Sequence, residues 1–180
     1  MAEADRLLDD LWRGVAWERH HVRIAGRRIP SPRLSAWYGV AGARYRYSGV
    51  TYEPLPLLPA LESVRRRLEG RVGARFNSVL VNAYRTGADS MGWHSDDERE
   101  LGPRPVIASV SLGAVRRFRL KHRDPGIAPV ALDLPHGSLL VMDGDTQAHW
   151  RHAVPKTRRP VGLRLNLTFR EIELGDPSRA

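Results

Sequence analysis

The chain has 180 residues, 42% of them apolar, and a formal net charge of +9 at pH 7. This length allows one domain with a hydrophobic core and is short for two. The lack of cysteine excludes disulfides, zinc–thiolate sites and cysteine nucleophiles, so His, Asp or Glu must hold any metal ion.

The basic composition favours a polyanionic partner, because summed positive charge attracts phosphate chains. However, 27 of the 29 basic residues are arginine, a bias that a GC-rich genome also produces, and a solvated basic surface is an equal alternative. No apolar run approaches the roughly 20 residues that span a bilayer, and the acidic N-terminus does not resemble a secretion signal. We expect a cytoplasmic or otherwise intracellular monomer with no membrane partner.

The first 75 residues predict a helix at each end and basic strands between them. A short helix is expected from Glu3 to Trp12, and a basic, strand-like stretch from Val15 to Ile29. Clustered aromatics lie beside arginines at 34–39 and 45–49. A second helix is predicted because apolar residues then recur at three- to four-residue spacing up to the glycines at 70 and 73. These residues are Leu57, Leu61, Val64 and Leu68.

Beyond Gly73 the pattern changes to short strands separated by Gly, Pro or Asp turns. The expected strands are Phe76–Tyr84, Val106–Leu112, Val115–His122, Val130–Leu134, Ser138–Met142, His149–Val154 and Val161–Phe169. Many strands without a βαβ alternation predict an α+β, mainly β fold, a jelly roll (double-stranded β-helix) with flanking N-terminal helices. We expect one domain over 1–180, with a substrate-recognition extension at 1–75 and the catalytic core at 76–172.

The stretch from Trp93 to Glu100 carries the strongest chemical pattern. On an extended strand, His94 and Asp96 point to the same face and can hold one object between them. With one distant histidine they make a two-His-one-carboxylate triad, which binds one face of an iron(II) octahedron and leaves the other positions open. Gly92 and the acidic run 96–98 suit a tight, exposed loop. The alternative without a catalytic role is that Asp97 and Glu98 begin a helix, where carboxylates favour the positive end of the helix dipole.

The third ligand is His149 or His152. These residues are three apart, so in one strand they face opposite ways and only one of them can join the site. His152 lies well inside the expected strand and His149 lies at its entrance, which favours His152. The other histidines have no partner pattern; they are His20, His21, His122 and His136.

The segment 164–170 alternates polar and apolar residues, which places Arg164, Asn166, Thr168 and Arg170 on one face. This face is either a cavity lining or the wet side of an edge strand. In a cavity, a planar guanidinium such as that of Arg164 would pair with a carboxylate through two parallel hydrogen bonds. A dicarboxylate cosubstrate would supply that group, and Asn82-x-Tyr84, again at i and i+2, would add neutral hydrogen bonds.

The order of these motifs resembles the AlkB family of iron(II)/2-oxoglutarate dioxygenases, especially the animal DNA-repair members. The motifs are Asn82-x-Tyr84, His94-x-Asp96, a downstream His152 and Arg164-x-Asn166-x-Thr168-x-Arg170. The likeness runs from about residue 24 to residue 172, and the RxNxTFR ending is specific to that family.

The resemblance implies that His94, Asp96 and His152 bind Fe(II) and that Arg164 pairs with the distal carboxylate of 2-oxoglutarate. It gives Asn82, Tyr84, Asn166 and Arg170 assisting roles toward that cosubstrate. The implied reaction consumes O2 and removes alkyl groups from damaged bases of the 1-methyladenine or 3-methylcytosine type, releasing formaldehyde, succinate and CO2. Alternatives are the same chemistry on RNA or on a small molecule, or a nucleic-acid-binding module without turnover.

The resemblance also implies a base pocket and a phosphate-binding surface. Tyr45 and Tyr47 match the family's base-pocket aromatics, and Asp97 matches a position near the substrate base. Arg27, Arg28 and Arg33 are expected to contact the nucleic-acid backbone. One departure is Ala25, which stands where duplex-specialised relatives carry an aromatic wedge; an alanine cannot stack, which favours a single-stranded substrate.

Overall fold

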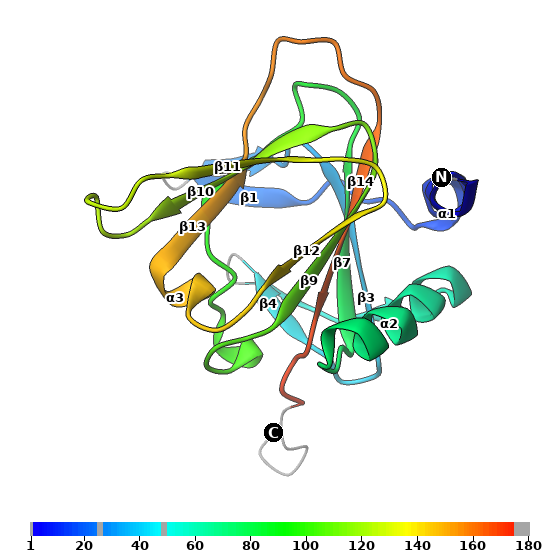
Figure 1. Cartoon of the computed structure of the whole chain (residues 1–180). Coiled ribbons are helices and arrows are strands. Elements are labelled where there is room, and N and C mark those ends of the chain that lie inside the picture. Colours follow the sequence, from blue (N-terminus) through cyan, green and yellow to red (C-terminus); the bar gives the residue numbers. More distant parts are fainter. Residues whose placement is uncertain (1, 25–26, 48–49, 175–180) are drawn as a thin grey trace.

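Two larger β-sheets, two β-hairpins and flanking helices make up the described part of the protein (Figure 1). The structure is a computed structural model that describes residues 2–24, 27–47 and 50–174. The helices are α1 (Ala2–Gly14), α2 (Pro59–Val72), α3 (Thr146–His149) and the 3-10 helix η1 (Arg99–Leu101). The first strands are β1 (His21–Ile24), β2 (Arg27–Pro30), β3 (Leu34–Gly39), β4 (Tyr45–Tyr47), β5 (Val50–Tyr52), β6 (Leu55–Pro56) and β7 (Ser78–Tyr84). The others are β8 (Met91–His94), β9 (Ile107–Gly113), β10 (Arg116–His122), β11 (Val130–Leu134), β12 (Ser138–Met142), β13 (Trp150–Val154) and β14 (Arg164–Arg170).

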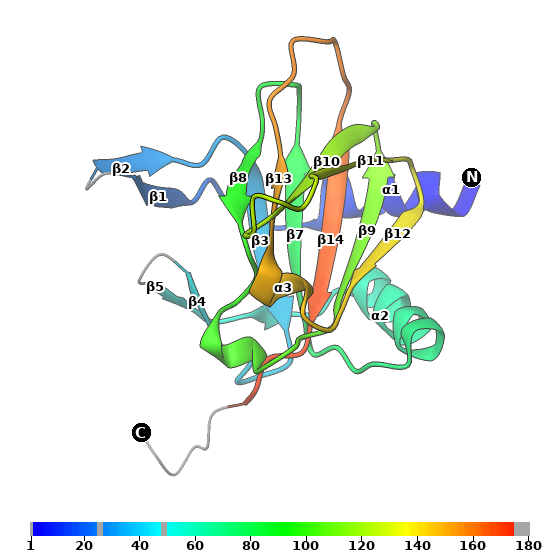
Figure 2. The same ribbon diagram turned by 60° about the vertical axis from the view of Figure 1, so that its left-hand side comes forward.

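The large sheet has the strand order β12-β9-β14-β7-β3-β6 and the small sheet the order β11-β10-β13-β8. Their strands pair antiparallel, apart from the parallel pair β3 and β6. The two sheets face each other in the expected jelly-roll arrangement, and the hairpins β1–β2 and β4–β5 extend from one side (Figure 2). Residues of α1, β3 and α2 pack in one apolar cluster with residues of the later strands.

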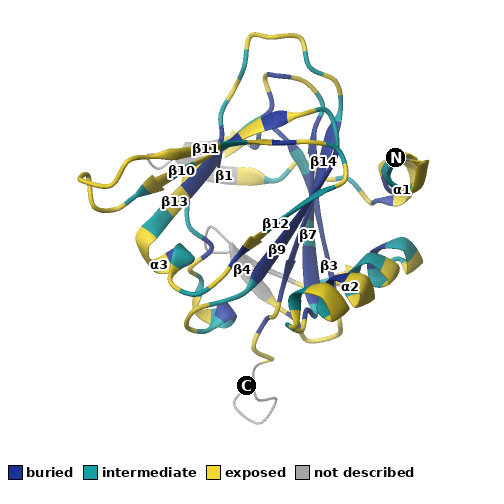
Figure 3. Cartoon of the chain, viewed as in Figure 1, coloured by how far each residue is buried: buried dark blue, intermediate teal, exposed yellow. Residues whose placement is uncertain are grey.

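Strand β14 lies in the middle of the large sheet, between β9 and β7, and all seven of its residues are buried (Figure 3). Its apolar residues Leu165, Leu167 and Phe169 belong to the core beneath α1 and α2. Its polar residues point the other way, toward the small sheet. A central, fully buried strand excludes the wet edge-strand alternative for segment 164–170 and confirms that its polar face lines an interior.

A second apolar cluster joins the two sheets. It contains Tyr84, Ile107, Phe118, Leu134, Met142 and Val154. These residues come from strands of both sheets, and their burial stabilises the face-to-face packing. The polar face of β14 is therefore enclosed between two layers.

Helix α2 begins and ends as its sequence predicts. A proline stands in its first turn, where no backbone N–H is needed, and Gly73 ends it with φ of 73°, a left-handed conformation that favours glycine. The N–H of Gly73 donates to the carbonyl oxygen of Glu69. No helix within the described ranges is long and apolar enough to cross a membrane.

Most expected elements are confirmed, but the segment before His94 is not. The bounds of β11 and β12 are those predicted, and the other expected strands differ by a few residues. The prediction of a tight, exposed loop around Gly92 was wrong: Met91–His94 is strand β8, which pairs with β13. Glycine at its centre hid the strand pattern. Ala25 lies outside the described residues.

We predict that Leu167→Ala lowers the free energy of unfolding by about 2–5 kcal/mol, because it deletes a fully buried side chain in the central strand. Urea unfolding of the purified protein measures this loss. Leu174→Ala is the matched control; its side chain is 55% exposed, and the expected change is within about 0.5 kcal/mol. Equal losses in both variants would contradict the placement of β14 in the core.

Candidate active site

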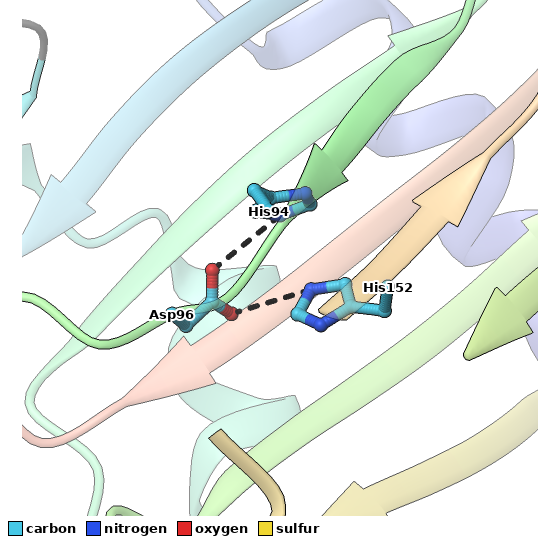
Figure 4. Close-up of side chains that lie close together, drawn as sticks. All are labelled: His94, Asp96 and His152. Carbon is cyan, nitrogen blue, oxygen red and sulfur yellow. Dashed lines mark ion pairs between the residues drawn. The ribbon is translucent and has the colours of Figure 1, made fainter. Parts of the chain in front are cut away.

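His94, Asp96 and His152 meet between the two sheets (Figure 4). One ligand atom from each lies within 4.8 Å of the others. The Nε2 atom of His94 is 3.6 Å from one carboxylate oxygen of Asp96, and the Nε2 atom of His152 is 3.9 Å from the other. Two imidazoles and a carboxylate converging in this way form a donor set that suits a divalent transition metal such as Fe(II).

The small sheet positions the two imidazoles. His94 ends β8 and lies directly opposite His152 of β13, so the strand pairing itself brings residues 58 positions apart side by side. The Nδ1 atom of His94 lies 2.9 Å from the carbonyl oxygen of Gly92. When Nδ1–H donates to that oxygen, the lone pair of Nε2 is left for a metal.

Asp96 follows β8 and is 2% exposed. Its backbone N–H donates to Oε1 of Gln147 at 2.9 Å, and the hydroxyl of Ser95 donates to the carbonyl oxygen of Trp150 at 2.9 Å. These bonds tie the segment after β8 to α3 and β13. The acidic run is therefore not wholly exposed, because Asp96 is buried and only Asp97 projects to solvent.

The charges around Asp96 keep it ionised. Burial alone would raise the pKa of Asp96, but the charge of Arg170, followed by those of His94 and His152, lowers it well below its usual value. The Nη2 atom of Arg170 donates to Asp96 at 2.8 Å. Burial also lowers the pKa of His152 to about 4, so this imidazole is neutral at pH 7 and its lone pair can bind a metal.

Arg164 is the most deeply buried cation of the site, at 1% exposure. Its Nη2 atom donates to the Ser111 hydroxyl at 2.8 Å, and its guanidinium lies 5.1 Å from the centre of the Tyr84 ring. Its Nε and Nη1 atoms are buried and have no hydrogen-bond partner among the described residues. Burial lowers the pKa of Arg164, yet an arginine stays protonated, so these atoms suit an anionic ligand.

Other predicted cosubstrate residues line the same interior, but they differ in how far other residues already engage their side chains. Asn82, Tyr84, Asn166 and Arg170 all border the cavity that holds the triad. The side chain of Asn166 is engaged by Ser109, the carbonyl of Val110 and Thr168. Tyr84 keeps its ring beside Arg164.

Arg33 is directed inward. It is 6% exposed, and its Nε atom donates to Oδ1 of Asn82 at 2.8 Å. The contact of Arg33 with the nucleic-acid backbone stays a prediction. Strand β3 turns this side chain inward, beside the cavity-lining Asn82, and sequence alone did not reveal its direction.

His149 lies apart from the triad. It is the last residue of α3 rather than the first of a strand, and its ring stacks on His122 at a centroid distance of 5.7 Å. Asp97 is exposed and pairs with Arg123 at 3.1 Å. The helix that follows the acidic run is the three-residue η1, and no side chain caps it.

The remaining predicted residues lie in the two hairpins. Arg27 and Arg28 belong to β2, and Tyr45 and Tyr47 to β4. The structure describes the backbone of these strands, and the side chains of these four residues lie outside the description. Their roles toward a base and its backbone stay predictions.

Gln147 and the serines of β9 are the site residues that sequence reasoning missed. The hydrogen bond between Gln147 and Asp96 joins residues 51 positions apart, and no sequence pattern predicts it. Ser109 and Ser111 stand at i and i+2 in an otherwise apolar strand. That alternation was a readable signal of a polar, inward face.

The comparison with protein families gives one match over most of the chain. The model of the 2OG-Fe(II) oxygenase superfamily matches residues 1–170. Human DNA oxidative demethylase ALKBH2 is 43% identical over 183 residues, covering 96% of this chain and 70% of that protein. Rat alpha-ketoglutarate-dependent dioxygenase alkB homolog 3 is 44% identical over 181 residues, covering 96% of this chain and 61% of that protein. The chain thus spans between 61% and 70% of the length of these two relatives.

Solved structures share the fold. The structure of OsALKBH1 has a TM-score of 0.68 at 17% identity, covering 94% of this chain and 92% of that chain. An oxidoreductase of the 2OG-Fe(II) oxygenase family from Burkholderia pseudomallei has a TM-score of 0.64 at 21% identity, covering 99% and 83%. At these identities the likeness concerns the fold alone, and it confirms the predicted jelly roll.

We predict that His152→Ala abolishes tight binding of Fe(II), because it removes one of three converging ligands. The expected loss of affinity exceeds the roughly 10- to 100-fold that loss of an outer-shell partner costs. Anaerobic calorimetric titration measures it. His149→Ala is the matched control and should leave the affinity unchanged; an equal loss in both variants would remove His152 from the triad.

We predict that Arg164→Lys raises the KM for 2-oxoglutarate about 10- to 100-fold, because an ammonium cannot reproduce the two-pronged hydrogen bonding of a guanidinium. Succinate formation at varied 2-oxoglutarate measures this change. Arg117→Lys alters an exposed ion pair with Asp133 and serves as the control. An unchanged KM in Arg164→Lys would exclude Arg164 from cosubstrate binding.

Proposed function

The chain belongs to the 2OG-Fe(II) oxygenase superfamily and, within it, to the AlkB family, and from this membership we propose that it removes alkyl groups oxidatively from N-alkylated bases of DNA. One observation carries the proposal: the His94–Asp96–His152 cluster and the buried Arg164 lie in the same interior, and two nitrogen atoms of Arg164 have no hydrogen-bond partner among the described residues. Its relatives that are named DNA demethylases support DNA as the substrate. The net charge of +9 fits a phosphate-bearing partner.

We assign the metal to the three clustered side chains. His94 and His152 would offer their Nε2 atoms, and Asp96 would offer a charged oxygen. Arg170 holds one Asp96 oxygen, and Gln147 holds the Asp96 backbone, so the carboxylate keeps a fixed orientation. The donor set has three members, which leaves room for ligands from outside the chain.

We assign 2-oxoglutarate to the interior lined by β7 and β14. Arg164 would receive its distal carboxylate through guanidinium donors that no other group engages, while the Nη2 atom also donates to the Ser111 hydroxyl. Tyr84, Asn82 and Arg170 would complete the polar lining. Asn166 would act through the hydrogen bonds that fix β14 to β9, since its amide is already engaged there.

When bound, Fe(II) supplies the oxidation chemistry that couples O2 and 2-oxoglutarate to hydroxylation of the alkyl carbon, with succinate, CO2 and formaldehyde as products. The chain's own residues orient the reactants and exclude water. Phe118 stacks on His152 at 5.3 Å and closes the apolar side of the site. The His94 ring is 26% exposed at its side chain and would face the incoming base.

A base on which this site acts must leave its stack, because an alkyl group on the pairing edge is hidden in a duplex. We propose that Tyr45 and Tyr47 grip the flipped base, with Asp97 near its exocyclic group. Arg27 and Arg28 would contact the backbone. In this proposal residues 1–75 serve substrate recognition and 76–172 serve catalysis, in a cytoplasmic monomer whose site comes from one chain.

We predict that the protein loaded with Fe(II), 2-oxoglutarate and O2 releases formaldehyde from a 1-methyladenine DNA oligonucleotide, with one succinate per formaldehyde. Fluorometric formaldehyde detection and mass spectrometry of the oligonucleotide measure this. Asp96→Asn, which removes the ligand charge, is the inactive control.

Three other outcomes would replace the proposal. Turnover confined to methylated RNA would make RNA the substrate. Succinate formation driven by a small molecule alone would indicate a metabolite enzyme. Tight oligonucleotide binding without formaldehyde from any alkylated strand would indicate a binding module.

A further inference from the structure

The strands that carry the site on their inner face carry cations on their outer face. Along β10, Phe118 is buried toward the site, whereas Arg119 and Lys121 are exposed. On β13, His152 is buried and Arg151 is exposed. On β8, His94 lines the cavity and Trp93 is 44% exposed. We name Trp93, Arg119, Lys121 and Arg151 the outer cationic face.

The charges of this face are uncompensated. Lys121 pairs in register with Arg151, so two like charges lie directly opposite on one side of the sheet, an arrangement that destabilises a ladder. Within residues 2–24, 27–47 and 50–174, no carboxylate forms an ion pair with Arg119, Lys121 or Arg151. By contrast, Arg117 of the same strand pairs with Asp133 at 2.7 Å. A solvated face gains nothing from opposed cations, whereas an anion bridging them would relieve the repulsion.

The aromatic member of the face is covered by a cation. The guanidinium of Arg119 lies 5.7 Å from the centre of the exposed Trp93 ring. Strand β13 lies between β10, which carries Arg119, and β8, which carries Trp93. Its residue Ala153, opposite Arg119, is only 4% exposed. An indole with a guanidinium over it makes a flat surface on which an unpaired base can stack.

The row of cations leads to the rim of the site. Side chains at i and i+2 of a strand recur about every 7 Å, which spaces Arg119, Lys121 and Arg123 along β10 and its continuation. The Nη2 atom of Arg123 donates to the Ser95 hydroxyl and to Asp97, each at 3.1 Å. Ser95 and Asp97 flank Asp96, so the row ends beside the metal cluster.

We propose that the outer cationic face binds single-stranded nucleic acid, with phosphates at Lys121 and Arg151 and a base on the Trp93–Arg119 pair. The inference rests on the proposed function, because it takes the bound strand to be the one whose damaged base enters the site. It adds a binding surface beyond the site mouth. A longer strand would therefore gain affinity that a strand covering only the mouth lacks.

Binding of an unmodified oligothymidine of roughly 25 nucleotides tests the proposal by fluorescence anisotropy at several salt concentrations. The slope of the logarithm of the association constant against the logarithm of the salt concentration is negative. We expect the double variant Lys121→Gln/Arg151→Gln to reduce the magnitude of this slope by about 1.4, since each single-strand phosphate contact contributes about 0.7. Arg117→Gln is the matched control, because that cation already has Asp133 as its partner. Equal slopes for the wild type and the double variant would overturn the proposal.

A second variant separates stacking from charge. Trp93→Ala should weaken single-strand binding roughly 5- to 100-fold and leave duplex binding unchanged, because only unpaired bases can stack. Trp93→Phe should restore most of the affinity. A loss that is equal for single strand and duplex would contradict the stacking role.

Turnover separates this proposal from the proposed function. The double variant should repair a 1-methyladenine trinucleotide as the wild type does and lose efficiency only on the long strand. Equal losses on both lengths would show that the face acts through the site and would overturn the inference. Failure of the wild type to release formaldehyde from any strand would refute the proposed function, whereas the salt slope would still report on this face.

Discussion

The buried ion pair between Asp96 and Arg170 is the interaction on which the site depends. Both side chains are 3% exposed, and the charged atoms are 2.8 Å apart. Removing one partner of such a pair leaves an uncompensated charge in the interior, at a cost of about 3–5 kcal/mol. The pair joins the segment after β8 to the end of β14. It thereby links the small sheet, which supplies both imidazoles, to the large sheet, which supplies the guanidiniums of Arg164 and Arg170.

The interior holds more positive than negative charge, and this imbalance favours an anionic ligand. Arg116 is 3% exposed, and its guanidinium donates hydrogen bonds to the backbone oxygens of Thr86, Asp89 and Pro155. Arg164 lies next to it with spare donors, and its charge is not matched by a carboxylate among the residues that the structure describes. A neutral ligand would leave that cost unrelieved. A dicarboxylate would offset one guanidinium and reach the metal with its other end.

The period of two along a strand couples the two faces of the small sheet. The register that places His94 opposite His152 also turns the side chains of Trp93 and Arg151 toward the outer surface of the sheet. A one-residue slip would expose the metal ligands and bury the cations together. The site and the outer cationic face are therefore consequences of one strand pairing, which is why a nucleic-acid surface and a metal centre can share β8, β10 and β13.

The sequence by itself determined the periodic features: the alternation of β14, the helix α2 with its closing glycine, the i, i+2 pair of His94 and Asp96, and the choice of His152 over His149. These follow from local backbone geometry, which neighbouring residues specify. Only the tertiary structure decided which remote groups meet. It placed Gln147 beneath Asp96, turned Arg33 inward to Asn82, made β8 a strand and put His149 in α3. Each of these depends on packing between segments tens of residues apart, and side-chain burial against a distant strand leaves no mark in local spacing.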